Sequence, residues 1–101
     1  MVVEHAQISV VPGREEEFVA AFPDALAVIS RAEGFEWAEL HRVVERPSVF
    51  LLRVGWRTLE DHTFGFRNSA LFADWRAVIG PFFDEPPVVE HVTQVAERFS
   101  V

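Results

Sequence analysis

The sequence predicts an α+β domain in which four strands and two helical regions follow one another in the order β-α-β-β-α-β. Two observations predict this class. Segments of alternating or continuous apolar residues, which are typical of strands, lie near both ends and in the middle of the chain. Two intervening segments place apolar residues three and four positions apart, as amphipathic helices do. This order is that of the ferredoxin-like split βαβ arrangement, with one antiparallel sheet.

The first half of the chain predicts a strand, a helix and a second strand. A strand over residues 1–11 ends at a Pro-Gly pair, and a helix over residues 14–32 begins with three glutamates, where the helix dipole favours negative charge. Pro23 is expected to kink this helix because it cannot donate to the carbonyl four residues back. Gly34 ends the helix, and residues 35–44 alternate as a strand. The alternation places these residues on one side: Phe35, Trp37, Glu39, His41 and Val43.

The third strand predicts a second copy of the chain. A turn at residues 45–48 makes a hairpin with the strand at residues 49–56, which is almost continuously apolar and is therefore expected to be buried on both faces. Two helices cover only one face of a sheet. The simplest cover for the other face is the same face of another copy, which predicts a homodimer whose two sheets close into one α/β barrel through a strongly apolar interface.

The second half of the chain predicts two short helices and a last strand. Thr58 is a good N-cap for a helix to about residue 66, Ser69 caps a segment over residues 70–79, and residues 88–99 form the final strand. Helical spacing turns one group of side chains toward the sheet, namely Leu59, His62 and Phe66. It turns another group away, namely Glu60, Thr63 and Arg67.

Composition excludes several classes of function. With 101 residues, a single domain over residues 1–101 is expected. The formal net charge of -7 argues against nucleic acid, anionic membranes and highly acidic substrates as partners. The absence of cysteine excludes disulfides, thiolate catalysis and thiolate metal sites. No segment has the pattern of a signal peptide or a membrane span, so we expect a cytoplasmic protein.

Several motifs carry a family resemblance. The second half contains Glu60-Asp61-His62-Thr63, Gly65-Phe66-Arg67, Ser69, Trp75-Arg76, Phe82-Phe83-Asp84 and Val89-Glu90-His91. The first half adds the helix entry Val11-Pro12-Gly13 and then Gly34-Phe35, and Trp56 ends the third strand. Together with the order of elements, these residues resemble the antibiotic biosynthesis monooxygenase family of dimeric α/β barrels over essentially the whole chain.

The resemblance implies a homodimer with a pocket between the sheet and the helices of each subunit. Characterised relatives oxidise electron-rich aromatic polyketides with dioxygen and use no metal or flavin, so no cofactor is expected. Other relatives degrade haem with an Asn, Trp and His set. This chain has Ala6 or Gln7 near the position of that Asn, and Trp75 at the position of the haem-ligating His, so haem degradation is not expected.

His62 is the candidate catalytic residue because it places an ionisable group on a face that should be buried. A neutral imidazole has a pKa near working pH and could remove a phenolic or anthrone C–H proton as a general base. We expect it to border a cavity lined by Trp or Phe and to stay neutral at pH 7. The alternative is a hydrogen-bonded histidine that stabilises the strand-to-helix turn.

The candidate substrate-binding residues are one arginine and five aromatic side chains. Arg67 could hold an enolate oxygen, although a salt bridge to Asp61, Asp74 or Glu60 is the favoured alternative. A flat pocket for aromatic rings could be lined by Trp37, Trp56, Phe66, Trp75 and Phe82, most of which must also serve as core.

The remaining histidines do not predict a metal site. The four histidines lack a local ligand spacing, and only His5 and His91, on the first and last strands, could meet.

The leading hypothesis is a cofactor-independent monooxygenase that acts on a small aromatic or polycyclic compound. The alternative is a non-catalytic dimeric domain that binds a small apolar ligand.

Overall fold

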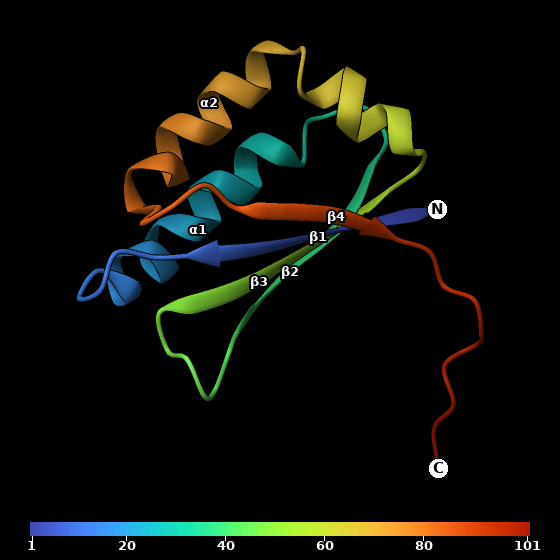
Figure 1. The fold of residues 1–101 in the computed structure, drawn as a ribbon. Coiled ribbons are helices and arrows are strands. Elements are labelled where there is room, and N and C mark those ends of the chain that lie inside the picture. The colour runs from blue at the N-terminus through green and yellow to red at the C-terminus, as the bar shows by residue number, and fades with distance from the viewer.

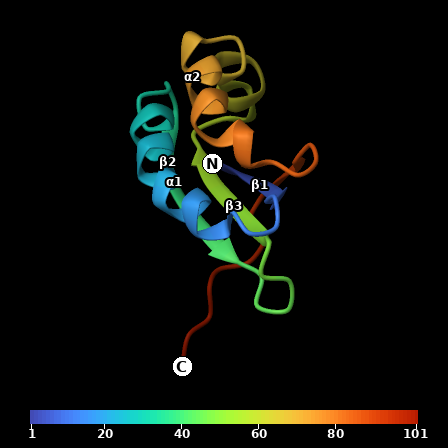
Figure 2. The ribbon, with the colours of Figure 1, turned by 90° about the vertical axis from the view of Figure 1, so that its left-hand side faces the viewer.

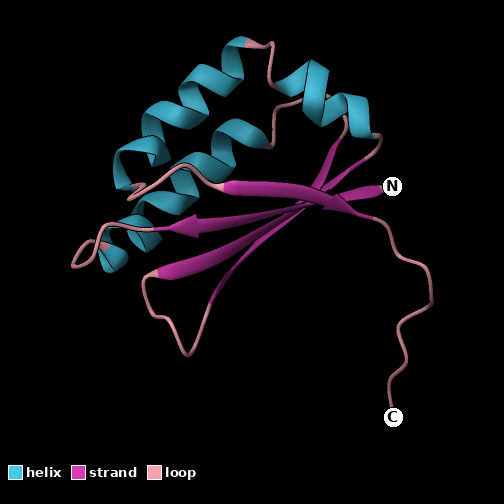
Figure 3. Ribbon diagram, in the orientation of Figure 1, coloured by secondary structure: helices cyan, strands magenta, loops and turns pink.

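The computed structural model describes all residues, 1–101, as one four-stranded antiparallel sheet with its helices on one side (Figures 1 and 3). The elements are β1 (Val2–Ser9), α1 (Glu15–Ile29), β2 (Phe35–Arg42), β3 (Val49–Trp56), η1 (Asp61–Phe66), α2 (Ala70–Ile79), η2 (Gly80–Phe82) and β4 (Val88–Val92). The strand order is β2-β3-β1-β4. The predicted ferredoxin-like fold is confirmed.

The core lies between the sheet and the helical layer. Inward-facing side chains of β1 and β3 meet the apolar faces of α1 and α2, and the largest fully buried side chains are Trp56, Phe18 and Phe50. Figure 2 shows α1 and α2 side by side over the same face. Neither helix has the length and apolar character that crossing a bilayer requires.

The other face of the sheet has no cover from this chain, as Figure 2 shows. Along β3, Phe50, Leu52 and Val54 are buried under the helices, whereas Leu51 and Arg53 on the other face are only half-buried. The expected burial of β3 on both faces is therefore not met within one chain. The uncovered face is also mixed rather than strongly apolar, because Glu39 pairs there with Arg53 at 3.2 Å and with His41 at 3.3 Å.

A β-bulge interrupts the alternation that was expected for β2. Phe35 pairs with Trp56 and Trp37 with Gly55, so Glu36 is an extra residue without a partner on β3. Phe35 consequently packs edge-on against Trp56 on the helix side, with ring centroids 6.1 Å apart, while the other predicted members of that face point away. Position 55 requires glycine, because a Cβ there would clash with the Trp37 ring.

The helix and strand ends also differ from the predicted ranges. Pro23 lies inside α1 on its exposed side, and the helix continues through it to Ile29. The last strand ends at Val92 rather than at residue 99, because Val92 pairs with Val3 and β1 has almost no residues left to offer a partner. The segment 93–101 leaves the sheet on the side away from the helices (Figure 1).

Candidate functional site

A pocket of about 670 Å³ opens between the sheet and the helical layer. This volume lies in the range of small-molecule sites. Its sheet side includes Ala6, Ile8 and Leu52, and its helical side includes Phe72 and Trp75. Its polar end is formed by Glu4, His62 and Arg67. The pocket therefore combines apolar walls with a small group of ionisable side chains at one end.

The segment that carries His62 is a π-helix, which the sequence did not predict. Thr58 caps the helical segment as expected, since its Oγ1 accepts the Asp61 N–H at 3.1 Å. From Asp61 onward the turns widen, and the Arg67 N–H donates to the His62 carbonyl at 3.3 Å, which is the i→i+5 pattern. Such single π turns occur often at functional sites.

The wider turn changes which side chains face the pocket. His62 and Phe66 are buried as predicted, each 3% exposed. Leu59 was expected inside but is 42% exposed, and Arg67 was expected to turn away but lines the pocket. Both expectations were wrong. For Arg67 the reason is that α-helical spacing was assumed, whereas a widened turn brings residue i+5 nearer to the face of residue i. Leu59 lies before the widened turns, at the start of the helical segment.

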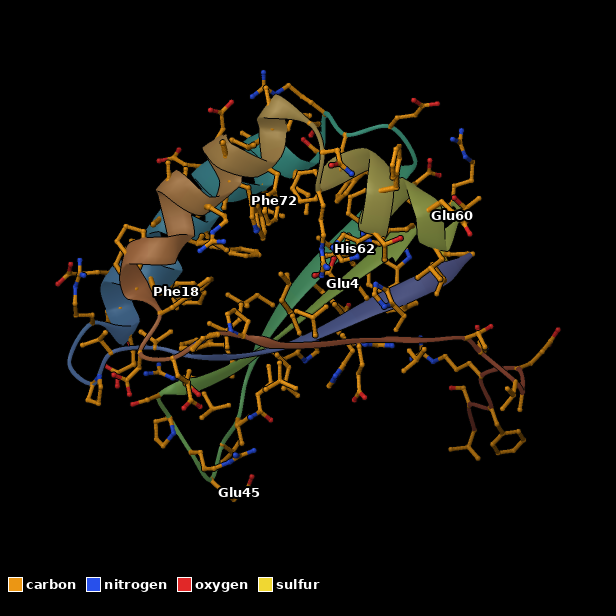
Figure 4. All side chains as sticks on the ribbon, turned by 45° about the horizontal axis from the view of Figure 1, so that its top comes forward. Glu4, Phe18, Glu45, Glu60, His62 and Phe72 are labelled. Atoms are coloured by element: carbon orange, nitrogen blue, oxygen red, sulfur yellow. The ribbon has the colours of Figure 1, made fainter.

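His62 lies between two other ionisable side chains, Glu4 and His91. Its Nε2 is 3.2 Å from Glu4 Oε1, and its Nδ1 is 2.7 Å from Nε2 of His91. Glu4 and His91 are direct cross-strand partners on β1 and β4, so the sheet itself places them together. Figure 4 shows His62 and Glu4 close together beneath the helical layer. The three side chains thus form a row that begins at the pocket and ends at β4, the edge strand.

The free atom at the pocket belongs to Glu4 rather than to His62. Oε1 of Glu4 accepts the Trp56 Nε1–H at 3.1 Å as well as the contact from His62. Oε2 has no hydrogen-bond partner, and no fully buried polar side-chain atom lacks a partner, so Oε2 opens toward the pocket. Both ring nitrogens of His62 are already occupied, and its ring stacks on Trp56 at 5.2 Å.

Burial sets the ionisation of this group. Burial raises the pKa of Glu4, while the Trp56 hydrogen bond and the charge of Arg67 oppose that rise. Burial also lowers the pKa of His62 to about 4, and the charges of Arg67 and His91 act in the same direction. His62 is therefore neutral at pH 7, and its 3.2 Å contact with Glu4 is not an ion pair.

The other predicted binding residues divide into two groups. Phe66, Arg67 and Trp75 line the pocket, and Trp56 lies directly behind His62. Trp37 and Phe82 lie outside the pocket. Trp37 faces the uncovered side of the sheet, and Phe82 packs in the core 5.8 Å from the ring of Phe18. Figure 4 shows Phe18 and Phe72 at separate places along the helical layer.

The expected partner of Arg67 is occupied elsewhere. Asp61 binds Arg57 at 3.1 Å, and Arg67 forms no salt bridge with any side chain of the protein. The favoured interpretation of Arg67 as a salt-bridge residue was therefore wrong. An unpaired guanidinium at the polar end of the pocket is available to a ligand.

Sequence reasoning missed Glu4 and His91. The signal for Glu4 was its position on β1, since an acidic residue shares the inward face with Ala6 and Ile8. His91 was considered only beside His5, but His5 lies on the opposite face of β1, so these two do not meet. The contact of His91 with His62 joins segments whose distance apart in the sequence gives no local pattern.

The chain belongs to the antibiotic biosynthesis monooxygenase family, because the family model described as "Antibiotic biosynthesis monooxygenase" matches residues 1–78. It is 40% identical over 95 residues to the uncharacterized protein YczJ of Bacillus subtilis (strain 168), covering 94% of this chain and 100% of YczJ. A structure of this family from Bordetella bronchiseptica is 41% identical and superposes with a TM-score of 0.91, covering 94% of this chain and 97% of that one.

A more distant structural relative is SnoaB, a cofactor-independent oxygenase from Streptomyces nogalater. It superposes with a TM-score of 0.78 and covers 95% of this chain and 94% of its own, but the sequence identity is 16%. At this identity the likeness shows a shared fold.

We expect His62 to make stability depend on pH. Because its pKa is about 4 in the folded protein and 6.5 ordinarily, the unfolded chain binds more protons between these values. The free energy of unfolding should therefore rise with pH across this window, by on the order of 2 kcal/mol from this residue. Denaturant unfolding of the wild type and His62→Gln between about pH 4 and pH 7 measures the difference.

The comparison with His62→Gln isolates one group among several that titrate. Glu4 has a raised pKa, so its contribution has the opposite sign and is lost as pH rises through its folded value. His91 has a lowered pKa and the same sign as His62. Both groups remain in the variant. If the two stability curves run parallel, His62 does not titrate with a lowered pKa.

Proposed function

We propose that this protein is a cofactor-independent monooxygenase that oxidises a small aromatic or polycyclic compound with dioxygen. The observation that carries this proposal is the unpartnered Oε2 of Glu4, which opens into an aromatic-walled pocket beside the unpaired Arg67. Membership of the monooxygenase family and the fold shared with a cofactor-independent oxygenase support the class of reaction. In this proposal the catalytic pair is Glu4 and His62, with Glu4 nearest the substrate.

The proposed reaction begins with a proton transfer from an acidic CH₂ group, as in an anthrone. Glu4 Oε2 takes the proton, the electron pair stays on the substrate as an enolate, and Arg67 stabilises the enolate oxygen. One electron passes from the enolate to dioxygen, and the resulting radical and superoxide join to form a C–O bond. The peroxide then takes the proton back from Glu4.

The second half of the reaction forms the product. Glu4 removes the remaining proton of the same carbon while the O–O bond breaks, which leaves a carbonyl and a hydroxide. The hydroxide takes that proton and leaves as water. One CH₂ and one O₂ thus become one C=O and one H₂O, with all electrons supplied by the substrate, so no external reductant enters the balance.

His62 and His91 are proposed to hold Glu4 ready for this work. If Glu4 is ionised, the tautomer of His62 that carries its proton on Nε2 can donate this proton to Oε1 of Glu4. Nδ1 of His62 then has no proton and can accept the Nε2–H of His91. His62 then stabilises the carboxylate as a neutral donor, and His91 is a positioning residue that fixes the tautomer of His62.

Oxygen uptake with an anthrone tests the proposed function. The purified protein, in buffer containing a metal chelator, should consume one O₂ for each quinone formed, at a rate clearly above the uncatalysed oxidation. If the anthrone quenches tryptophan fluorescence on binding but no oxygen is consumed above background, the protein is instead a domain that binds an apolar ligand.

We also propose a homodimer formed through the uncovered face of the sheet. The half-buried Trp37 and Leu51 on that face, and the absence of any covering element, favour a second copy as its cover. A stable interface buries about 1,200 Å² or more in total. Sedimentation equilibrium at micromolar concentration should give twice the chain mass, and a monomer there would exclude this assembly.

A further inference from the structure

We propose that the compound bound in this pocket is an aromatic carboxylate that is attracted by the two unpaired arginines of the pocket lining, Arg67 and Arg76. This inference rests on the proposed function only in taking the same pocket as the substrate site. It adds the charge of the ligand, which neither the fold nor the family determines.

The first argument is that the cations of the pocket have no partners. All nine cationic side chains are arginines, in a chain with sixteen acidic residues. Four arginines form ion pairs with carboxylates on the surface: Arg14, Arg42, Arg53 and Arg57. Arg67 and Arg76 both line the pocket, and neither forms an ion pair despite this excess of acidic groups.

The second argument is that the charge of Arg67 acts on the polar end without being neutralised there. Its charge acts to lower the pKa values of His62 and His91 and opposes the rise that burial causes in the pKa of Glu4, yet none of these side chains forms a hydrogen bond with it. The Arg67 guanidinium therefore keeps an unpaired positive charge, and its electrostatic field reaches this end of the pocket. A carboxylate is the group that this field attracts.

The third argument is the aromatic wall that connects the two arginines. The Arg76 guanidinium lies over the ring of Phe72, with its central carbon 5.9 Å from the centroid. Phe72 in turn packs edge-on against Phe66, the residue before Arg67, at 5.5 Å. A flat ring that packs on this wall can present a substituent to guanidinium groups, which bind carboxylates through paired N–H donors.

Two acidic residues of the lining limit the ligand to one acidic group. Asp84 and Glu85 also line the pocket, from the segment that precedes β4. Glu85 accepts a hydrogen bond from Ser9 at 3.2 Å, and Asp84 has no ion pair. A second carboxylate there would be repelled. The two acidic residues therefore exclude highly acidic ligands from the pocket, whereas a ligand with a single negative charge can still bind.

Two probes of nearly equal shape test the charge of the ligand by binding alone. Anthracene-9-carboxylate and anthracene-9-carboxamide differ in charge, and quenching of tryptophan fluorescence reports binding because Trp75 lines the pocket. The carboxylate should bind at least about tenfold more tightly at low salt. Arg67→Gln and Arg76→Gln should each reduce that preference several-fold.

The control is Arg46→Gln, at an exposed arginine without an ion pair in the turn between β2 and β3, which should keep the preference. Equal binding of the two probes, no binding of either, or an unchanged preference in both pocket variants would overturn the inference. An arginine-dependent preference for the carboxylate without any oxygen consumption would leave the inference standing and reject the proposed oxidation.

Discussion

Glu4→Gln should lower kcat/KM for oxidation of an anthrone by about a hundredfold to ten-thousandfold, the scale of a lost general base. The amide has the shape of the carboxyl group and can still accept the Trp56 N–H, so packing at the buried position is kept. It has no basic oxygen at the pocket, so proton removal from the substrate becomes slow. Initial rates of oxygen uptake and quinone formation measure the effect.

The matched control for this variant is Glu90→Gln. Glu90 neighbours His91 in sequence but pairs across the sheet with His5, and it is exposed on the opposite face. This variant removes the same charge from the same part of the protein and should keep the wild-type rate. If both variants oxidise the anthrone at the wild-type rate, Glu4 is not the base. If Glu4→Gln fails to fold, Glu4→Asp should retain partial activity.

Phe18→Ala should destabilise the protein by about 3–5 kcal/mol, as large-to-small changes of a buried aromatic residue do. Phe18 is fully buried on α1, and its ring lies 4.9 Å from that of Phe50 on β3. It therefore joins the helical layer to the sheet. Truncation removes apolar contact on both sides and leaves a cavity that a rigid sheet cannot close.

Phe64→Ala is the control for this stability prediction, because Phe64 is 72% exposed on η1. The same chemical change there should alter the free energy of unfolding by no more than about 0.5 kcal/mol. Urea unfolding of the three proteins at pH 7 gives the comparison. Similar losses of stability in the two variants would show that the core is not organised around Phe18.

The sequence determined the fold because its signals are local. Apolar periodicity located every strand and both long helices, and the Thr58 cap located the start of the segment that carries His62. The order of elements then left few sheet topologies, since neighbouring segments pair by short connections. His62 was found for the same reason, as an ionisable residue at a buried helical position.

The tertiary structure decided what surrounds His62. Glu4 and His91 meet it through the register of β1 with β4, and that register joins residues more than eighty positions apart. Arg67 reaches the pocket because η1 widens into a π-helix, which changes the facing of every later residue in that segment. The bulge at Glu36 and the end of β4 at Val92 likewise depend on which strand offers a partner. Pairing across the sheet and hydrogen bonding within a widened turn are settled by packing of the whole chain, so no local pattern in the sequence records them.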